Sequence, residues 1–274
     1  MTRSNILALI IITILNSCNG TPEKYIHQQD KKKQTNDTTI NIPCIEPFIQ
    51  ITSIGNVDIE YAKGEYGIQA TGYSDVIDLL ETTFDSGILT IGMRNETRIE
   101  LSTIKSKQNI RLYITSPELK YLAICGNGNF TSNGIIQTES FQTGNFASGR
   151  ILIDSIKCNN FKFESNDIGN TTVNHVHCNH ANISTFGSSE TNITLDAQKN
   201  ISLFTGGNST NNIKAETELL EIFSSNKSTG IFDIECTDLN VIAKNNSTLT
   251  FKGRTKNKNF KKDFGCKIDL FNLE

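Results

Sequence analysis

Three carboxylates recur at nearly constant spacing in the second half of the chain, at Asp196, Glu216 and Glu235. If the structure repeats with the same period, they form one outward row on neighbouring units. Such a row could hold a cation such as calcium, or supply the general acid and base of a polysaccharide-cleaving enzyme. Lys214 and Lys252 lie near it in the same pattern and would neutralise it. We therefore interpret the row as a solvated face, with a cation ladder as the alternative.

A histidine-rich stretch is the densest group of potential metal ligands. His175, His177 and His180 surround Cys178, and zinc prefers imidazole and thiolate ligands. A zinc site needs these side chains on one face, whereas counting in units of about 20 residues puts His175 inward, beside Val173, and the others at a corner. We interpret them as core or corner histidines. We expect no catalytic residues, no metal and no other cofactor.

The cysteines leave two interpretations open. Cys158 and Cys178 are one period apart, so their Cα atoms would lie about 4.8 Å apart on adjacent parallel strands, which a disulfide can span. Side chains in register on parallel strands point the same way, however, and a bridge would be strained. The chain also lacks the C-x-x-C spacing of zinc sites. We expect buried free thiols, with a disulfide as the alternative.

The best candidate for a partner surface is a set of apolar residues at the same spacing, Phe204, Phe223 and Ile242. If the strand continues through these positions, they form an exposed apolar stripe on three successive units, which is typical of an interaction surface. If the chain has already turned at a corner, they point inward. The sequence leaves both alternatives open.

Placing these residues requires a repeating scaffold, and the sequence contains one. Apolar-x-apolar pairs begin every 19 or 20 residues, at Leu122, Phe141, Phe161, Ala181, Ile201, Leu220 and Leu239. From the second pair on, another apolar residue follows twelve positions after each start, at Ile153, Val173, Ile193, Ile213, Phe232 and Phe251. Clusters of Gly, Asn and Ser, such as GNGN at 126–129, follow most pairs, and these residues tolerate the positive φ of tight corners.

A unit of 20 residues with two short strands cannot bury its own apolar face. Stacking the units in register pairs each strand in parallel with its copy and merges the inward residues into one core. The sequence therefore predicts an all-β fold, a parallel β-solenoid of about seven coils.

The solenoid repeats are expected over residues 119–253. Residues 45–118 read as strands with one helical turn near Val76, and we expect a β region that continues the core and caps its N-terminal end. Residues 254–274 read as a basic segment followed by a covering strand.

The first residues are typical of a bacterial lipoprotein signal. Arg3 precedes an apolar run at 6–15, which is too short to span a bilayer. The run ends in Leu-Asn-Ser-Cys, so residues 1–17 are the expected signal peptide and Cys18 the expected lipidation site, which would attach the chain to a membrane. Residues 18–44 are polar and are expected to form a disordered tether. The net charge of −3 argues against nucleic acid as a partner.

Several turn motifs resemble a known family over about residues 45–253. They are Gly-Asn-Val within Ile51–Ile59, Lys63-Gly64-x-Tyr66, Asp85-Ser86-Gly87-x-Leu89-x-Ile91, and Ser116-Pro117-Glu118-Leu119 leading to 126–129. The family is the head GIN domain, an autotransporter-adhesin-type β-solenoid of Gram-negative envelope proteins, many of them lipoproteins. It usually has Ser-Gly-Ser-Gly-Asp-type turns where this chain has Cys125 and Asn127. The resemblance implies a β-solenoid fold and a location in the cell envelope. It identifies no catalytic residues.

Together these observations predict a non-enzymatic, lipid-anchored protein of the bacterial cell envelope, at the outer membrane. We expect an adhesin-like interaction module that binds a glycan or a protein. One alternative is a polysaccharide lyase or hydrolase on the same scaffold, and the other is a structural or regulatory envelope component.

Overall fold

The computed structural model describes residues 37–94 and 110–274. The signal peptide, Cys18 and most of the expected tether lie outside this part of the chain. The described residues form strands and one helical turn, α2 (Ser74–Ile77), which confirms the turn expected near Val76. No helix in this part is long and apolar enough to cross a membrane.

The strands fall into two groups. The N-terminal group comprises β1 (Asp37–Asn41), β2 (Gln50–Ser53), β3 (Val57–Lys63), β4 (Gly67–Tyr73), β5 (Leu80–Asp85), β6 (Ile88–Met93) and β7 (Ile110–Ser116). The solenoid comprises β8 (Tyr121–Ile124), β9 (Asn129–Gln137), β10 (Ser140–Asn145), β11 (Arg150–Lys157), β12 (Asn160–Ser165), β13 (Asn170–Thr185), β14 (Glu190–Thr205), β15 (Thr210–Ser224), β16 (Thr229–Ala243), β17 (Thr248–Lys262) and β18 (Lys267–Leu273).

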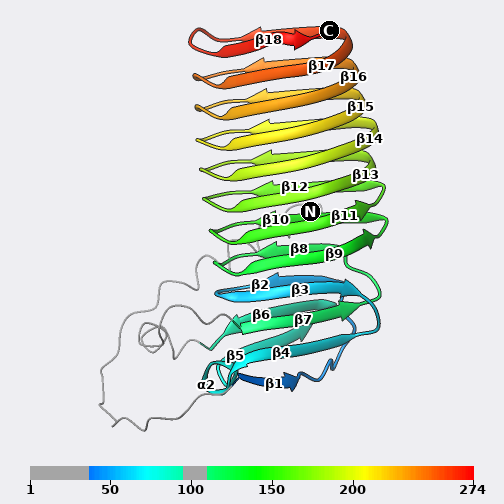
Figure 1. Cartoon of the computed structure of the whole chain (residues 1–274), viewed down its shortest axis with the longest axis vertical. Helices are drawn as coiled ribbons and strands as arrows, with labels where there is room; N and C mark the ends of the chain where they lie inside the picture. Colours follow the sequence, from blue (N-terminus) through cyan, green and yellow to red (C-terminus); the bar gives the residue numbers. More distant parts are fainter. Residues whose placement is uncertain (1–36, 95–109) are drawn as a thin grey trace, which may run out of the picture. The chain divides into compact units, whose positions relative to one another are not determined.

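From β8 onward the chain winds as a parallel β-solenoid of about eight turns, one more than expected (Figure 1). The predicted interior file is confirmed. Its members are register partners on successive coils, each no more than 3% exposed: Ile153, Val173, Ile193, Ile213, Phe232 and Phe251. Each coil thus buries the apolar residues that its neighbours expose, which is how units this small become stable.

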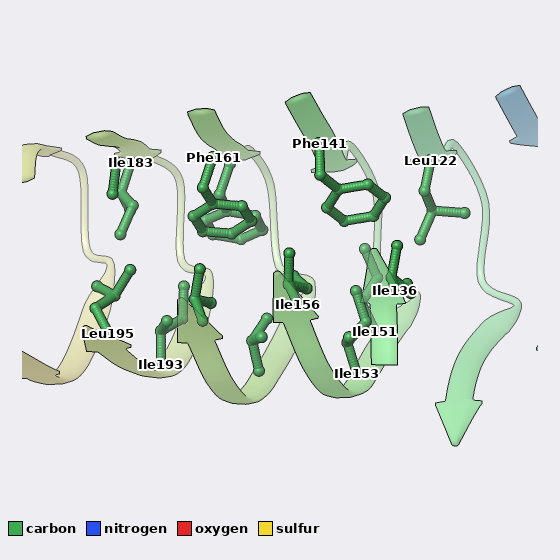
Figure 2. Packing of buried hydrophobic residues seen from close by; sticks show 14 of the residues in the cluster. Leu122, Ile136, Phe141, Ile151, Ile153, Ile156, Phe161, Ile183, Ile193 and Leu195 are labelled. Carbon is green, nitrogen blue, oxygen red and sulfur yellow. The ribbon is translucent and has the colours of Figure 1, made fainter. Parts of the chain in front are cut away.

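A second file faces the first across the core. Phe141, Phe161, Ala181, Ile201, Leu220 and Leu239 are register partners and buried. Figure 2 shows side chains of this face, such as Phe141 and Phe161, opposite isoleucines of the other face, such as Ile151 and Ile156.

The first coil departs from the expected register. Leu122 lies beside Thr143 and not beside Phe141, so the step is 21 residues where the pattern predicted 19. Leu122 also pairs with Ile51 of β2 on its other side. The position of β8 is therefore constrained from both sides, and a strand outside the repeat takes part in setting it.

The Gly/Asn/Ser clusters form the corners, as predicted. Most coils have a left-handed residue there, and these residues follow one another along the stack: Asp167, Gly187, Gly207, Asn226 and Asn245. Backbone hydrogen bonds tie neighbouring corners together, with Ser188 N donating to the Asp167 carbonyl at 2.6 Å and Asn208 N to the Gly187 carbonyl at 2.6 Å.

The N-terminal strands continue the solenoid out of chain order. β2 pairs in parallel with β6 and β8, and β3 with β7 and β9, so the β2–β3 coil is inserted between β6–β7 and β8–β9. Three antiparallel pairings then finish this end: β5 on β6, β4 on β7 and β1 on β4. The expected cap is confirmed, and it supplies partners for strand edges that would otherwise be open.

The expectation of a disordered tether is wrong for residues 37–41. They form β1, in which Ile40 lies opposite Ala70 of β4. The pairing offers this polar segment a complete hydrogen-bonded edge, which its composition alone did not indicate.

The basic segment is a strand of the solenoid and extends the repeat beyond residue 253. The second half of β17 pairs with β16, and Lys258 continues the file of Leu220 and Leu239. A lysine here ends the apolar file and leaves a charged edge, which disfavours further strand addition. β18 pairs in parallel with the first half of β17.

Candidate functional site

The three predicted carboxylates do form one row, which we call the acidic row (Asp196, Glu216 and Glu235). They are direct register partners on β14, β15 and β16. The register also places a basic side chain at each end, His177 beside Asp196 and Arg254 beside Glu235. His177 Nδ1 lies 2.8 Å from Asp196 Oδ2. The row is thus flanked by potential cations, which favours its interpretation as a solvated face.

The histidine-rich stretch is arranged differently from the expectation. His175 is half-buried and does not point into the core, because the chain bends after Val173 and Val176 takes the inward position. The ring centroids of His175 and His177 instead lie 4.4 Å apart. His180 Nδ1 is hydrogen-bonded to Asn200 Oδ1. Among the residues that the structure describes, no group of three or more His, Cys, Asp or Glu side chains could hold a metal ion.

The six cysteines of the described chain are all free thiols. Cys158 and Cys178 are buried, and burial raises the pKa of the Cys158 thiol to about 11. Burial, with smaller contributions from Cys158 and Asp196, raises the pKa of the Cys178 thiol to about 12. Both side chains therefore stay protonated at neutral pH and are poor nucleophiles.

We expect both buried thiols to react slowly with iodoacetamide. Raising the thiol pKa from the ordinary value of 9.0 to about 11 in Cys158 and about 12 in Cys178 reduces the thiolate fraction at pH 8 roughly a hundredfold and a thousandfold, respectively. Mass spectrometry of the folded and guanidinium-unfolded chain measures the two rates, with half-buried Cys44 as the internal control. Equal rates for Cys158 in both states would contradict this burial. Stability should also fall as the pH rises from 9 through 11 and 12, because only the unfolded thiols ionise at the start of that window.

The apolar stripe lies on the outside of the solenoid, so the first of its two alternatives is confirmed. Phe204, Phe223 and Ile242 are register partners, and we call them the apolar row. Phe204 and Ile242 are 44% and 38% exposed, and the rings of Phe204 and Phe223 have centroids 6.3 Å apart. Lys244 Nζ lies 5.8 Å from the Phe223 ring centroid, in the range of a cation–π interaction.

Phe186 extends the apolar row, and the sequence reading missed it. Its side chain is 44% exposed, and its ring lies so close to the backbone of Gly206 that a Cβ there would be 2.9 Å away. Gly206 follows Phe204 by two residues, so both rings lie on the outer surface of neighbouring coils. The register partner of Phe204 is Ser184, and Phe186 lies two residues after Ser184. The constant spacing of 19 or 20 residues that links Phe204, Phe223 and Ile242 therefore does not include Phe186.

A groove of 690 Å³ on the opposite sheet was also not predicted. It crosses the outer face of five adjacent strands, β4, β7, β3, β9 and β11. One line of neighbouring side chains across its floor is Thr71, Arg111, Asp58, Asn129 and Arg150. These residues come from both sides of the inserted β2–β3 coil, so no repeat in the sequence brings them together. We call this surface the arginine groove.

The family comparison decides the relationship. The family model described as "Putative auto-transporter adhesin, head GIN domain" matches residues 47–219. The chain belongs to this family. The match runs from β2 through β14 into β15 and includes the head GIN turn motifs, and it confirms the resemblance seen in the sequence. A head GIN protein described as an adhesin acts outside the cytoplasm. No curated protein matches the chain.

Solved structures of similar fold carry related descriptions. A "putative adhesin" from Parabacteroides merdae has a TM-score of 0.71 at 15% identity, covering 87% of this chain and 96% of the other. One from Parabacteroides distasonis has a TM-score of 0.66 at 14% identity, covering 87% and 98%. One from Bacteroides fragilis has a TM-score of 0.53 at 14% identity, covering 87% and 97%. At these identities the likeness shows that the head GIN solenoid fold is shared.

Proposed function

We propose that this chain is a non-enzymatic, lipid-anchored interaction module of the bacterial cell envelope, attached at the outer membrane and adhesin-like in action. The observation that carries the proposal is the apolar row, three large side chains aligned on the outer face of successive coils. Exposed apolar patches of this kind are typical of interaction surfaces. The description of the family as an adhesin supports the same function.

The lipid anchor is proposed from the sequence. The apolar run at 6–15 ends in Leu-Asn-Ser-Cys, the arrangement of an acylated lipoprotein, and acyl chains on Cys18 would hold the solenoid at a membrane surface. The basic side chains at the ends of the acidic row support the non-enzymatic part of the proposal. A general acid and base would need carboxylates placed in different environments, whereas these three share one exposed face.

The test uses cells that display the full chain and measures their adhesion to a panel of immobilised glycans and envelope proteins. We expect F204S/F223S to reduce adhesion at least tenfold with an unchanged circular dichroism spectrum, because the substitutions remove exposed apolar contact area without opening the core. The matched control is I231S, which replaces an apolar residue that is 47% exposed on the other sheet. Adhesion that persists in F204S/F223S, or that is lost equally in I231S, would refute the proposed role of the row.

The anchor is checked on the same cells. Cys18→Ser should abolish incorporation of radiolabelled palmitate and release the chain from the membrane fraction. Intact-cell proteolysis then reports whether the solenoid faces outward. Unchanged palmitate labelling in Cys18→Ser would show that the lipid is attached elsewhere or that the anchor is of another kind.

A further inference from the structure

The arginine groove has two cationic side chains that form no ion pair with any other described residue. Arg111 and Arg150 are exposed, and within the described part of the chain no carboxylate lies at ion-pairing distance from either one. The carboxylate that stands between them is already engaged, because Asp58 Oδ1 accepts hydrogen bonds from Asn129 N at 2.9 Å and Asn129 Nδ2 at 2.8 Å. Among the described residues of the groove, the two guanidinium groups are therefore the charged donors that can pair with an anionic ligand.

The spacing of these donors suits an extended ligand. Arg111 and Arg150 are separated by three strand-to-strand steps, through Asp58 and Asn129, which is about 14 Å at 4.8 Å per step. At that backbone separation each arginine can pair with a different anionic group, and an oligomer with repeated anionic groups offers one to each. Guanidinium pairs with carboxylate or sulfate in a bidentate way.

A second line of side chains adds an aromatic ring and hydrogen-bonding groups. Tyr113 is 46% exposed and lies between Gln69 and Glu60 on the neighbouring strands. Asn133 Nδ2 lies 3.5 Å from Glu60 Oε1. Because a flat ring can cover the apolar face of a sugar while amide and carboxylate groups bond its hydroxyls, this line fits a carbohydrate. The volume of 690 Å³ also falls in the range of ligand sites.

The strand pairing argues against an extended peptide as the ligand. Peptides that bind sheets commonly add a strand at an open edge. All five strands under the groove already have partners on both sides, since β4 lies between β1 and β7, and β11 lies between β9 and β13. The floor of the groove therefore offers side chains and no free backbone edge.

We propose that the arginine groove binds an acidic oligosaccharide, with Arg111 and Arg150 pairing its carboxylate or sulfate groups and Tyr113 stacking on a sugar ring. The inference deepens the proposed function, because it gives the interaction module a second site with a defined ligand class. It does not use the apolar row, which lies on the other sheet.

The test is a binding titration of the detergent-solubilised full chain at physiological salt. The probes are oligogalacturonate and a heparin-derived sulfated oligosaccharide, compared with a neutral dextran oligosaccharide, poly-glutamate and inorganic polyphosphate. We expect at least one acidic oligosaccharide to bind at least tenfold more tightly than the three comparison probes. R111Q and R150Q should each weaken that binding at least tenfold, and Y113A about fivefold. The matched control is R254Q, an exposed arginine on the last coil, which should leave the affinity unchanged.

Three results would overturn the inference. They are an absence of binding to both acidic oligosaccharides, equal affinity for poly-glutamate or polyphosphate, and equal losses in R254Q and R111Q. F204S/F223S in the same titration keeps this test separate from the test of the proposed function. That variant should lose adhesion and bind the oligosaccharide normally. Adhesion that persists in F204S/F223S, while the wild-type chain binds an acidic oligosaccharide, would refute only the proposed function. Adhesion that is lost in F204S/F223S, while the wild-type chain binds neither acidic oligosaccharide, would refute only this inference.

Discussion

Gly128→Ala is expected to lower the free energy of unfolding by about 3 kcal/mol. A Cβ at this position would lie less than 3.0 Å from the carbonyl oxygen, the carbonyl carbon and the nitrogen of Val57. These are backbone atoms of the β2–β3 coil, which is paired on both sides and has no free direction in which to move. Gly126 is equally restricted by the backbone of Gly55. The glycines of GNGN are therefore needed for close approach between coils rather than for positive φ.

Thermal unfolding followed by circular dichroism measures the effect. A loss of about 3 kcal/mol corresponds to a melting temperature lower by roughly 6–12 °C for a domain of this size. The control is Gly64→Ala, where the nearest atom to the added Cβ is Thr115 Cβ at 3.5 Å, an ordinary contact. That variant should stay within about 0.5 kcal/mol of wild type. Similar melting temperatures for the two variants would contradict the close packing of the first coil on β2–β3.

Phe232→Ala is expected to cost about 4 kcal/mol, the larger of the two effects. The Phe232 side chain is fully buried, and its ring stacks on that of Phe251 with centroids 5.0 Å apart. The same ring fills the space that a side chain at Gly230 would need. Removing it opens a cavity between two coils of a stiff parallel stack, which cannot collapse to fill it. Because a solenoid is stabilised mainly by contacts between neighbours, the loss should be concentrated in the C-terminal coils.

Hydrogen exchange locates this loss. In Phe232→Ala the amides of β16, β17 and β18 should exchange much faster, while those of β10 and β11 keep the wild-type rates. Phe271→Ala is the control, because its ring is 90% exposed and its removal should change the stability by less than about 0.5 kcal/mol. Uniformly faster exchange along the whole chain would mean that the stack unfolds as one cooperative unit.

Some surface features follow from the repeat, and others do not. The acidic row and the apolar row could be predicted because their members are one period apart, and the period becomes the register of the stack. His177 belongs to the first of these lines and could have been found by counting 19 residues back from Asp196. Phe186 and the arginine groove could not be found in this way, because their residues share no offset.

The interior beside the corners is another feature that the pattern did not indicate. Thr205, Ser224 and Ser228 are buried and hydrogen-bonded to one another at 2.7–3.1 Å. Thr185 Oγ1 likewise donates to Asn211 Oδ1 at 2.8 Å inside the coil. The assumption that polar residues point outward is wrong at these positions. Hydroxyl and amide groups on neighbouring coils form hydrogen bonds with one another, and these bonds allow the groups to be buried.

By itself, the sequence determined the winding of residues 119–253, the interior file from Ile153 to Phe251 and the left-handed corners. It could do so because a parallel stack repeats the same contacts between neighbouring coils. The residue types that make these contacts therefore recur at a regular spacing in the chain. Only the tertiary structure decided that β2–β3 is inserted between later strands, that Leu122 lies beside Thr143, and that Arg111 and Arg150 share a groove. These contacts join segments that are not copies of one another. They depend on the shape of the packed strands and on backbone pairing, so they cannot be predicted from a regular spacing in the sequence.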